Sequence, residues 1–263
     1  MRLIDAFWEK RNLGLSVAEI TFESGETPQQ LDPNLFKTYD YIVAKVPSGE
    51  VSTIHGLEQL GFRFLESQFD LSIRLNNIPQ RTQSSDFLMK KITTSPLDSR
   101  EQIEELVEHI TPELFEVDRV SIDPEVGKTV GALRYKNWVL DEFTKGNIFA
   151  HRLHLGSTPI GFFILKKIGP SKLFAMLAGL FSQYKNKGLG LSIVQKPIDW
   201  AREQKYEEIV TRNSSNNSES FKIHLACGYR LDSISYLLRW KRKDNSLEGA
   251  NHVKSGSHSK SFL

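Results

Sequence analysis

A pattern that recurs after 167 positions is the feature that most constrains the fold of this chain. Residues 41–73 match residues 208–240 without a gap: an Ile-Val pair near the start of each copy and a Gly-aromatic-Arg step further on fall on each other. In each copy a β-rich run ends in a polar turn, a helix of two to three turns follows, and a second β-rich run closes the unit. Chance likeness between two strand-helix-strand units is the alternative, but the equal spacing favours a duplicated half-domain.

The second half of the chain alternates helical and strand patterns. It opens with a capping box, Ser99 with Gln102 three residues on, ahead of apolar residues at helical spacing. The patterns predict helices from Ser99 and over 131–146, a hairpin over 147–169 with its turn at Gly156-Ser157, a strand over 171–181, a helix after Gly190, a strand over 207–213, a helix from Ser218 and a strand over 229–240. The order α-α-β-β-β-α-β-α-β predicts an α/β (α+β) fold with a mixed central sheet flanked by helices.

Composition divides the chain into three parts. Residues 76–98 mix Pro, Ser, Thr and Gln, which predicts a linker, so we expect an N-terminal lobe over 1–95 and a second domain over 96–242. Residues 243–263 are polar and rich in Ser, Asn and Gly, and are predicted to be a disordered tail. The two tail histidines are expected to be solvated rather than metal-binding.

Charge and cysteine content exclude several classes of function. The net charge is +2, from 34 basic and 32 acidic residues, so nothing favours nucleic acid or a membrane surface as a partner. The single cysteine, Cys227, excludes an internal disulfide and a cysteine-based zinc site, and we expect no metal. The charged start of the sequence and the absence of a run of about 18 apolar residues predict neither a signal peptide nor a membrane span. We expect a cytoplasmic protein.

The stretch FSQYKNKGLGLSIV, residues 181–194, predicts a strand that enters a helix through a glycine turn. Free amides and the dipole at a helix N-terminus attract anions, and glycines let a phosphate approach the backbone. The spacing is neither a Walker A loop nor a Rossmann fingerprint. Taken alone, it favours a plain strand-to-helix turn.

The same stretch resembles the pyrophosphate loop of the GCN5-related N-acetyltransferases, in which Arg or Gln, two residues, Gly, one residue, and Gly or Ala follow one another. Lys185 stands at the first position, and the order of helices and strands is also that of the family. In a second family motif, Asn217 matches the Asn that precedes a helix. His224 stands where the family has a Tyr that often protonates the leaving thiolate, and a histidine, with a reference pKa of about 6.5, suits that task.

The resemblance implies acetyl-CoA as cosubstrate and His224 as the catalytic acid. The residues that it implies for cofactor binding lie on one strand end, the loop and the next helix start: Leu180, Ser182, Lys185, Asn186, Lys187, Gly188, Leu189, Gly190 and Asn217. Amides near Leu180 and Ser182 would hold the pantetheine arm and polarise the thioester carbonyl.

A partial copy of the fold joined to a complete one is similar to the enzymes that acetylate nucleotide-linked 4-amino sugars, such as the TDP-fucosamine acetyltransferases of surface-polysaccharide pathways. The implied acceptor is a small molecule, a nucleotide-linked amino sugar. The alternatives are another small amine, a protein N-terminus, or a non-catalytic acyl-CoA-binding module. The sequence leaves open whether the N-terminal lobe forms a homodimer interface or part of the acceptor pocket.

The base that deprotonates the acceptor is not assigned, because the strand at 171–181 carries no acidic residue. The residues considered for this role are His151, His154 and Tyr184. Those considered for the diphosphate or the sugar ring are Arg119, Arg134 and Tyr135, with a solvated helix face as the alternative.

Overall fold

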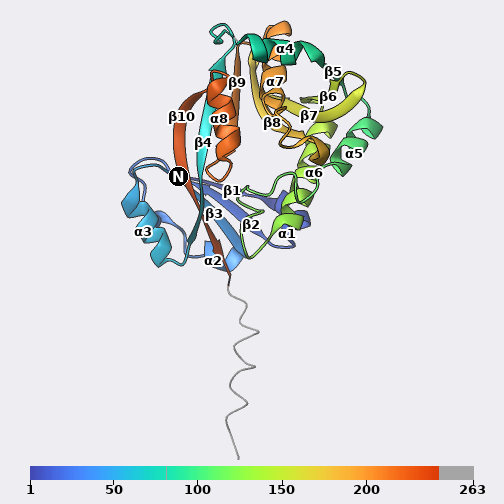
Figure 1. Cartoon of the computed structure of the whole chain (residues 1–263). Coiled ribbons are helices and arrows are strands. Elements are labelled where there is room, and N and C mark those ends of the chain that lie inside the picture. The colour runs from blue at the N-terminus through green and yellow to red at the C-terminus, as the bar shows by residue number, and fades with distance from the viewer. Residues whose placement is uncertain (81, 243–263) are drawn as a thin grey trace, which may run out of the picture.

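The computed structural model describes residues 1–80 and 82–242 (Figure 1). Its strands are β1 (Arg2–Asp5), β2 (Val17–Thr21), β3 (Tyr41–Pro47), β4 (Arg63–Arg74), β5 (Ile92–Pro96), β6 (Ile148–Leu155), β7 (Thr158–Lys167), β8 (Lys172–Leu180), β9 (Glu208–Ser214) and β10 (Arg230–Lys241). Its α-helices are α1 (Lys10–Leu13), α2 (Leu35–Thr38), α3 (Val51–Gln59), α4 (Gln83–Lys91), α5 (Arg100–Glu108), α6 (Lys128–Thr144), α7 (Ser192–Glu203) and α8 (Ser218–Ala226). Short 3-10 helices are η1 (Phe7–Glu9), η2 (Pro28–Gln30) and η3 (Ser182–Tyr184). The predicted tail lies outside the described residues.

All ten strands join in one mixed sheet, in the order β1-β2-β3-β10-β4-β9-β8-β7-β6-β5. The last strand, β10, lies between β3 and β4, while β4 lies between β10 and β9 (Figure 1). Each half of the chain therefore places one strand inside the other half. The mixed sheet flanked by helices confirms the predicted fold class.

The strand exchange follows the internal repeat. A shift of 167 positions takes Gln68 to Ser235, and these two residues are themselves register partners at the centre of the β4–β10 pair. The same shift takes the pair Pro47–Ser235 of β3 and β10 onto the pair Ser214–Gln68 of β9 and β4. The two halves are thus related by an approximate twofold axis between β4 and β10, which is the arrangement that a duplicated half-domain would give.

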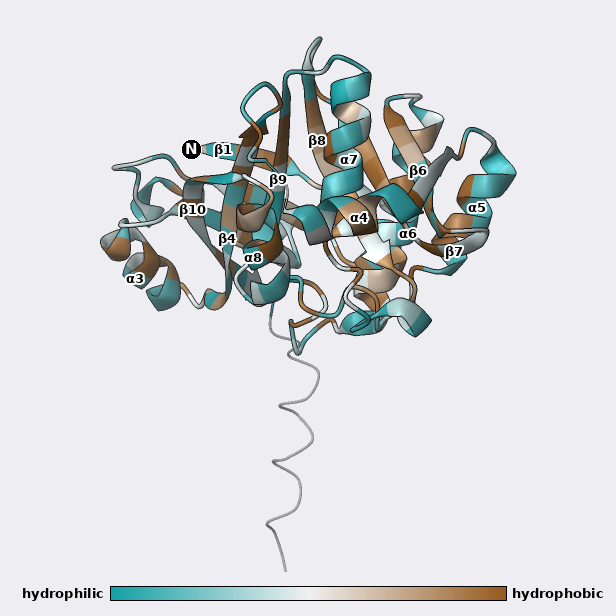
Figure 2. Cartoon of the chain, turned by 45° about the horizontal axis from the view of Figure 1, so that its top comes forward, coloured by the Kyte–Doolittle hydropathy of each residue, from teal (hydrophilic) through white to brown (hydrophobic). Residues whose placement is uncertain are grey.

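Two helical layers cover the C-terminal part of the sheet. Along β7 the side chains alternate, so that Phe163 and Leu165 pack in the core beneath α4 and α7, while Phe162 and Ile164 pack against α5 and α6. Figure 2 shows the hydrophobic residues on the strands and the hydrophilic faces of α5 and α7 turned outward. None of the helices in the described part of the chain combines the length and apolar character needed to cross a membrane.

The predicted elements of the second half are present in the predicted order. The capping box is formed: Ser99 Oγ accepts from the Gln102 amide at 3.2 Å, and the Gln102 side chain accepts from the Ser99 amide at 3.1 Å. The hairpin turn lies at Gly156-Ser157, between β6 and β7. The helix predicted over 131–146 begins earlier, at Lys128, because Gly127, with φ of 92°, starts it.

The linker predicted over 76–98 is wrong in part, because this segment contains α4 and β5. Thr82 caps α4 by accepting from the Ser85 amide. Strand β5 is an edge strand that pairs with β6, and it ends at Pro96, a residue that edges tolerate. The local sequence is polar and predicts a loop, but long-range pairing with β6 makes this segment a strand. The domain division at 95/96 stays a prediction, and it falls within β5.

The exchange of strands predicts that the C-terminal part does not fold alone. A fragment of residues 76–242 lacks β4, which leaves β9 and β10 without a shared neighbour and removes the buried Leu71 and Ile73. Losing one such side chain costs about 2–5 kcal/mol, against a total stability of roughly 5–15 kcal/mol. We expect no cooperative thermal transition by circular dichroism. Co-expression with residues 1–75 should restore one, and a sharp transition of the fragment alone would contradict the strand exchange.

Candidate active site

Strands β8 and β9, which are neighbours in the sheet, separate along their length. β8 and β9 are parallel register partners only from Lys172 to Phe174 of β8. Just beyond, the Thr211 hydroxyl still reaches the Ala175 carbonyl at 3.1 Å, after which the strands have no shared register. A bulge at Met176 interrupts the pairing of β8 with β7 at the same level. The edge of β8 from here to its end is therefore free to bind an extended molecule.

The equivalent strands of the N-terminal lobe stay closed. β2 and β3 pair in parallel over five positions, from Val17–Tyr41 to Thr21–Lys45. The described structure thus contains a split of this kind in the C-terminal half and a closed pair at the equivalent place of the N-terminal half.

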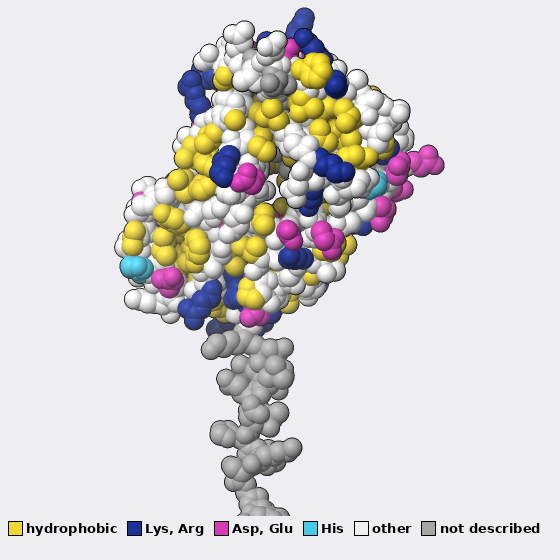
Figure 3. All heavy atoms as spheres, in the orientation of Figure 1, with side chains coloured by type: hydrophobic (Ala, Val, Ile, Leu, Met, Phe, Trp, Pro, Cys, Tyr) yellow, Lys and Arg dark blue, Asp and Glu magenta, His cyan; other side chains and the backbone are white. Residues whose placement is uncertain are grey.

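A groove of about 1040 Å³ runs through the split. On the side of α7 and α8 it is lined by Val194, Asn217 and His224, and on the other side by Glu66 and Arg212. Figure 3 shows a hollow in the middle of the molecule with basic and acidic side chains on its rim. The groove therefore connects the two faces of the sheet.

The loop between β8 and α7 has unpaired backbone amides, and it adjoins the groove at Lys185. Asn186 and Gly188 have φ of 60° and 75°, which turns the chain sharply before α7. Within the described part of the chain, the amides of residues 186–191 donate no hydrogen bond. A Cβ on Gly190 would come within 3.2 Å of Ile223 Cδ1, so any larger residue there would require the Ile223 side chain to shift. These features fit the anion site predicted from the sequence.

Both lysines of the loop, Lys185 and Lys187, have contacts within the protein. Lys185 Nζ donates to the carbonyl of Glu113, and Lys187 Nζ lies 5.6 Å from the centre of the Tyr184 ring. Leu180 and Leu189 are buried, and Ser182 lies in η3, so these residues can serve a ligand mainly through their backbones.

Asn217 and His224 lie on the same wall of the groove. Asn217 Oδ1 caps α8 by accepting from the Ser220 amide at 3.2 Å. His224 Nδ1 lies 2.7 Å from the Ser220 carbonyl, an arrangement that fits a proton on Nδ1 and leaves Nε2 as an acceptor. Burial lowers the pKa of His224, although the Ser220 carbonyl partly offsets this effect. The neutral ring is therefore favoured at neutral pH, which weakens the predicted role of His224 as an acid.

Tyr229, which the sequence analysis did not select, lies beside His224. Their ring centres are 4.9 Å apart, and both line the groove. Burial raises the pKa of Tyr229, so its phenol keeps its proton at neutral pH. The signal was present in the sequence, since Tyr229 directly follows Gly228 in the family motif.

Glu66 is the second residue that the sequence did not reveal. It lies on β4, is 4% exposed, and accepts a hydrogen bond from the Ser214 hydroxyl at the end of β9. Burial raises the pKa of this carboxyl, and the Ser214 hydrogen bond offsets part of the rise. A buried carboxylate with a raised pKa, on the wall of a groove, is suited to accept a proton.

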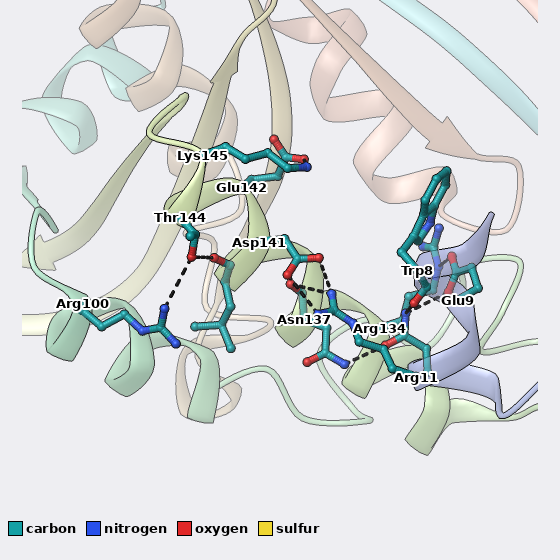
Figure 4. A network of polar contacts seen from close by, with 12 residues as sticks. Trp8, Glu9, Arg11, Arg100, Arg134, Asn137, Asp141, Glu142, Thr144 and Lys145 are labelled. Atoms are coloured by element: carbon teal, nitrogen blue, oxygen red, sulfur yellow. Dashed lines mark hydrogen bonds and ion pairs between the residues drawn. The ribbon is translucent and has the colours of Figure 1, made fainter. Parts of the chain in front are cut away.

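The arginines considered for a diphosphate are both neutralised by the N-terminal lobe. Arg119 pairs with Glu19 of β2, and Arg134 of α6 pairs with Glu9 of η1. Figure 4 shows the second pair beside the contact between Arg11 and Asp141, which also joins the start of the chain to α6. These ion pairs hold the N-terminal lobe against α6.

Tyr135, considered for the sugar ring, also lines the groove. Its ring lies 4.9 Å from that of Phe115, and burial raises its pKa. It therefore forms part of an aromatic wall rather than a solvated helix face.

Comparisons with known proteins agree with this geometry. No family model matches the chain. The dTDP-fucosamine acetyltransferase of Escherichia coli O6:H1 (strain CFT073) is 22% identical over 236 residues, which cover 88% of this chain and 94% of that protein. A GCN5-related N-acetyltransferase from Sphaerobacter thermophilus superposes with a TM-score of 0.54 at 12% identity, over 76% of this chain and 59% of its own. One from Kribbella flavida gives 0.53 at 14% identity, over 89% and 84%.

The chain has the GCN5-related N-acetyltransferase fold. At these identities the solved structures show the fold alone, and the predicted fold is confirmed. Within this fold, the loop before α7 is the part that the resemblance led us to expect.

The three residues considered as bases lie elsewhere or have other partners. His154 hydrogen bonds with Ser95 Oγ of the edge strand β5, and Tyr184 lies in η3 under Lys187. His151 is 6% exposed and stacks on Phe163, with 4.8 Å between ring centres. Its Nδ1 has no hydrogen-bond partner within the described residues.

Because His151 is buried, we expect the free energy of unfolding of the protein to depend on pH in acidic solution. Burial lowers its pKa to about 4, below the usual 6.5, so the unfolded state binds the proton more readily. The free energy of unfolding should therefore be unaffected above pH 6.5 and should fall between pH 6.5 and 4. Since one pKa unit is worth about 1.4 kcal/mol, we expect a loss of about 2 kcal/mol that His151→Phe removes. Urea unfolding at pH 7.5 and 4.5 measures it. His154→Phe is the control, and equal pH dependence in the wild type and His151→Phe would refute the assignment.

Proposed function

We propose that this protein is an acetyl-CoA-dependent N-acetyltransferase that acts on a nucleotide-activated, TDP-type amino sugar of surface-polysaccharide biosynthesis. The observation that carries the proposal is the groove through the split sheet, with a loop of unpaired amides beside it on one face and the buried carboxylate of Glu66 on the other. A transferase that joins two substrates needs such a passage, since each substrate enters from its own side.

The donor would lie along the free edge of β8. The amides of residues 186–191 would bind its pyrophosphate, and the edge of β8 around Leu180 and Ser182 would hold the pantetheine arm. Backbone donors near the bulge at Met176 would polarise the thioester carbonyl as negative charge develops on its oxygen. Asn217, whose Oδ1 is engaged in the helix cap, would contact the arm through its remaining amide nitrogen.

The acceptor amine would attack the carbonyl carbon from the Glu66 side. Its nitrogen forms the new C–N bond, and the proton that it loses passes to the Glu66 carboxylate, directly or through water. The carbonyl carbon then releases the sulfur as the C–S bond breaks, and the oxyanion returns to a carbonyl. Aligning the amine and the thioester contributes much of the rate.

The departing thiolate needs a proton, and two side chains on the same wall could supply it. His224 must first be protonated, which its lowered pKa disfavours at neutral pH. Tyr229 is protonated throughout the neutral range. We retain His224 as the sequence-derived hypothesis and add Tyr229 as the second donor, because both rings line the same wall of the groove.

The choice of acceptor rests on the relative and on the charges of the groove. The similar E. coli protein is a dTDP-fucosamine acetyltransferase by name, and it matches over nearly the whole chain. Lys45 and Arg212 line the acceptor side, which suits an anionic substrate better than a polyamine. A buried carboxylate placed to accept a proton favours catalysis over a non-catalytic acyl-CoA-binding module. A cytoplasmic location agrees with a nucleotide-sugar substrate.

Release of free thiol from acetyl-CoA tests the proposal. We expect release with one or a few nucleotide-linked 4-amino or 3-amino sugars, and none above background with spermidine or short peptides. Gly188→Val should abolish release and weaken CoA binding at least tenfold by calorimetry, because its side chain enters the phosphate loop at a left-handed φ. Gly156→Val, at a hairpin turn with φ of 62°, controls for backbone strain alone. CoA binding without turnover on any amine would exclude the enzymatic reading.

Glu66→Gln should lower kcat by about 100-fold or more, because general-base catalysis contributes that much. In the wild type, kcat should rise with pH through the raised pKa of Glu66, and the variant should lack that limb. CoA binding should stay unchanged, which separates lost catalysis from lost folding. Glu208→Gln on β9, a strand carboxylate that pairs with Lys172, is the matched control. A variant with full kcat would exclude Glu66 as the base.

A further inference from the structure

A row of five groove-lining residues crosses the sheet from Glu66 to its edge. The register partners connect without a break: Glu66 of β4 with Leu237 of β10, Leu237 with Lys45 of β3, Lys45 with Thr21 of β2, and Thr21 with Arg2 of β1. Register partners present their side chains on the same face of a sheet. All five line the groove, so the row forms a continuous floor.

The row changes character with distance from Glu66. Glu66 and Leu237 are 4% and 3% exposed, Thr21 and Lys45 are half-buried, and Arg2 is exposed. Because neighbouring strands lie about 4.8 Å apart, Lys45 lies roughly 10 Å from Glu66 along the floor, and Arg2 roughly 19 Å. The floor is therefore dry and apolar beside the base, cationic at mid-length and open at the far end.

Lys45 is the cation that the groove offers at mid-length. Its Nζ is 3.1 Å from Asp70 and 2.9 Å from Gln68, and Asp70 is also bound by Arg212 at 3.0 Å and by the Ser233 hydroxyl at 3.0 Å. Two cations thus share one carboxylate, which leaves a net positive charge beside the groove. In contrast, Arg119 and Arg134 each have a carboxylate partner of their own.

The open end carries an unneutralised arginine and two aromatic rings. Arg2 forms no ion pair or side-chain hydrogen bond within the described residues, and it lines the groove. Phe7 and Trp8 of η1, which follows β1 directly, are 74% and 36% exposed, and their ring centres are 5.3 Å apart. In Figure 4 no dashed contact reaches the Trp8 ring, whereas Arg11 and Arg134 are joined to their partners. Exposed rings beside a groove suit a planar ligand that stacks.

We propose that this floor is the nucleotide-binding half of the acceptor site, with Lys45 and Arg212 on the diphosphate and Phe7, Trp8 and Arg2 on the nucleoside. The inference rests on the proposed function and deepens it by naming the residues that select a nucleotide-linked acceptor. The separation of Lys45 from Glu66 is that of a sugar ring with its first phosphate, and Leu237 faces the ring between them. An amine at Glu66 then places the diphosphate on the lysine and the base near the aromatic pair.

Binding of thymidine 5′-diphosphate to protein saturated with CoA tests the site directly. Saturation matters because CoA itself carries a nucleotide and a pyrophosphate, which would otherwise compete for the donor loop. Calorimetry should detect one bound thymidine 5′-diphosphate per chain. Lys45→Met and Trp8→Ala should each weaken it about tenfold or more, since charge-assisted hydrogen bonds and base stacking are each worth about 1–3 kcal/mol. Affinity for CoA should not change.

Matched controls lie outside the groove. Lys172→Met removes a strand lysine that pairs with Glu208, and Phe64→Ala removes a 51% exposed ring on β4. Both should leave thymidine 5′-diphosphate binding unchanged. Binding that disappears when CoA is saturating, or that persists in Lys45→Met and Trp8→Ala, would overturn the inference.

Kinetics separate this inference from the proposed function. In an active enzyme, Lys45→Met and Trp8→Ala should raise KM for the nucleotide-linked sugar at least tenfold while KM for acetyl-CoA is unchanged, and they should not affect KM for a free amino sugar. An unchanged KM for the nucleotide-linked sugar would refute the subsite although the function stands. Thymidine 5′-diphosphate binding that Trp8→Ala abolishes, in a protein that acetylates no amine, would retain the subsite and refute the function.

Discussion

The exchange of β4 and β10 is the constraint on which the rest of the structure depends. β4 of the N-terminal half is hydrogen bonded on both sides by strands of the C-terminal half, and β10 of the C-terminal half is hydrogen bonded on both sides by strands of the N-terminal half. Neither half therefore has a complete sheet of its own. The exchange also determines the site, because β4 carries Glu66 to the end of β9, where the Ser214 hydroxyl binds it. A carboxylate from the N-terminal half thereby lines a groove whose other wall belongs to the C-terminal half.

Equivalent strand pairs of the two halves differ, because one pair is hydrogen bonded along its length and the other is split. β2 and β3 remain paired to Thr21–Lys45, whereas β8 and β9 part after Phe174. An open strand edge leaves backbone groups without partners, which is unfavourable unless water or a ligand binds them. Retaining the split in one half only limits this cost, and the closed pair supplies a rigid floor. In the proposed function, the half with the split would bind the donor and the half with the closed pair would face the acceptor.

Local features of the sequence predicted local features of the structure. The capping box at Ser99, the turn at Gly156-Ser157 and the glycine loop before α7 are encoded within a few residues, and the repeat marked the duplicated half-domain. Glu66 could not be found in this way, because its place on the wall of the groove depends on β4 reaching β9 across the approximate twofold axis. The same holds for Arg119, whose carboxylate partner Glu19 lies 100 residues away in the sequence. The lowered pKa of His224 follows from burial, which no motif specifies.

Neutralisation of most buried charges would allow a groove lined by both acids and bases to favour an anionic acceptor of the proposed kind. Glu9 and Glu19 are matched by arginines of the opposite half, so these pairs attach the lobes to each other and leave little field in the groove. Along the floor and beside it, the charges without a full partner among the described residues are the carboxylate of Glu66, the shared pair of Lys45 and Arg212, and Arg2 at the rim. Their order follows the distance from the split. The negative charge of Glu66 lies nearest to it, where the amine of the proposed acceptor would lose a proton, and the positive charges lie further out. An acceptor with its amine at one end and its phosphates beyond would experience attraction at both places, whereas a substrate with cationic groups throughout would meet repulsion at Lys45.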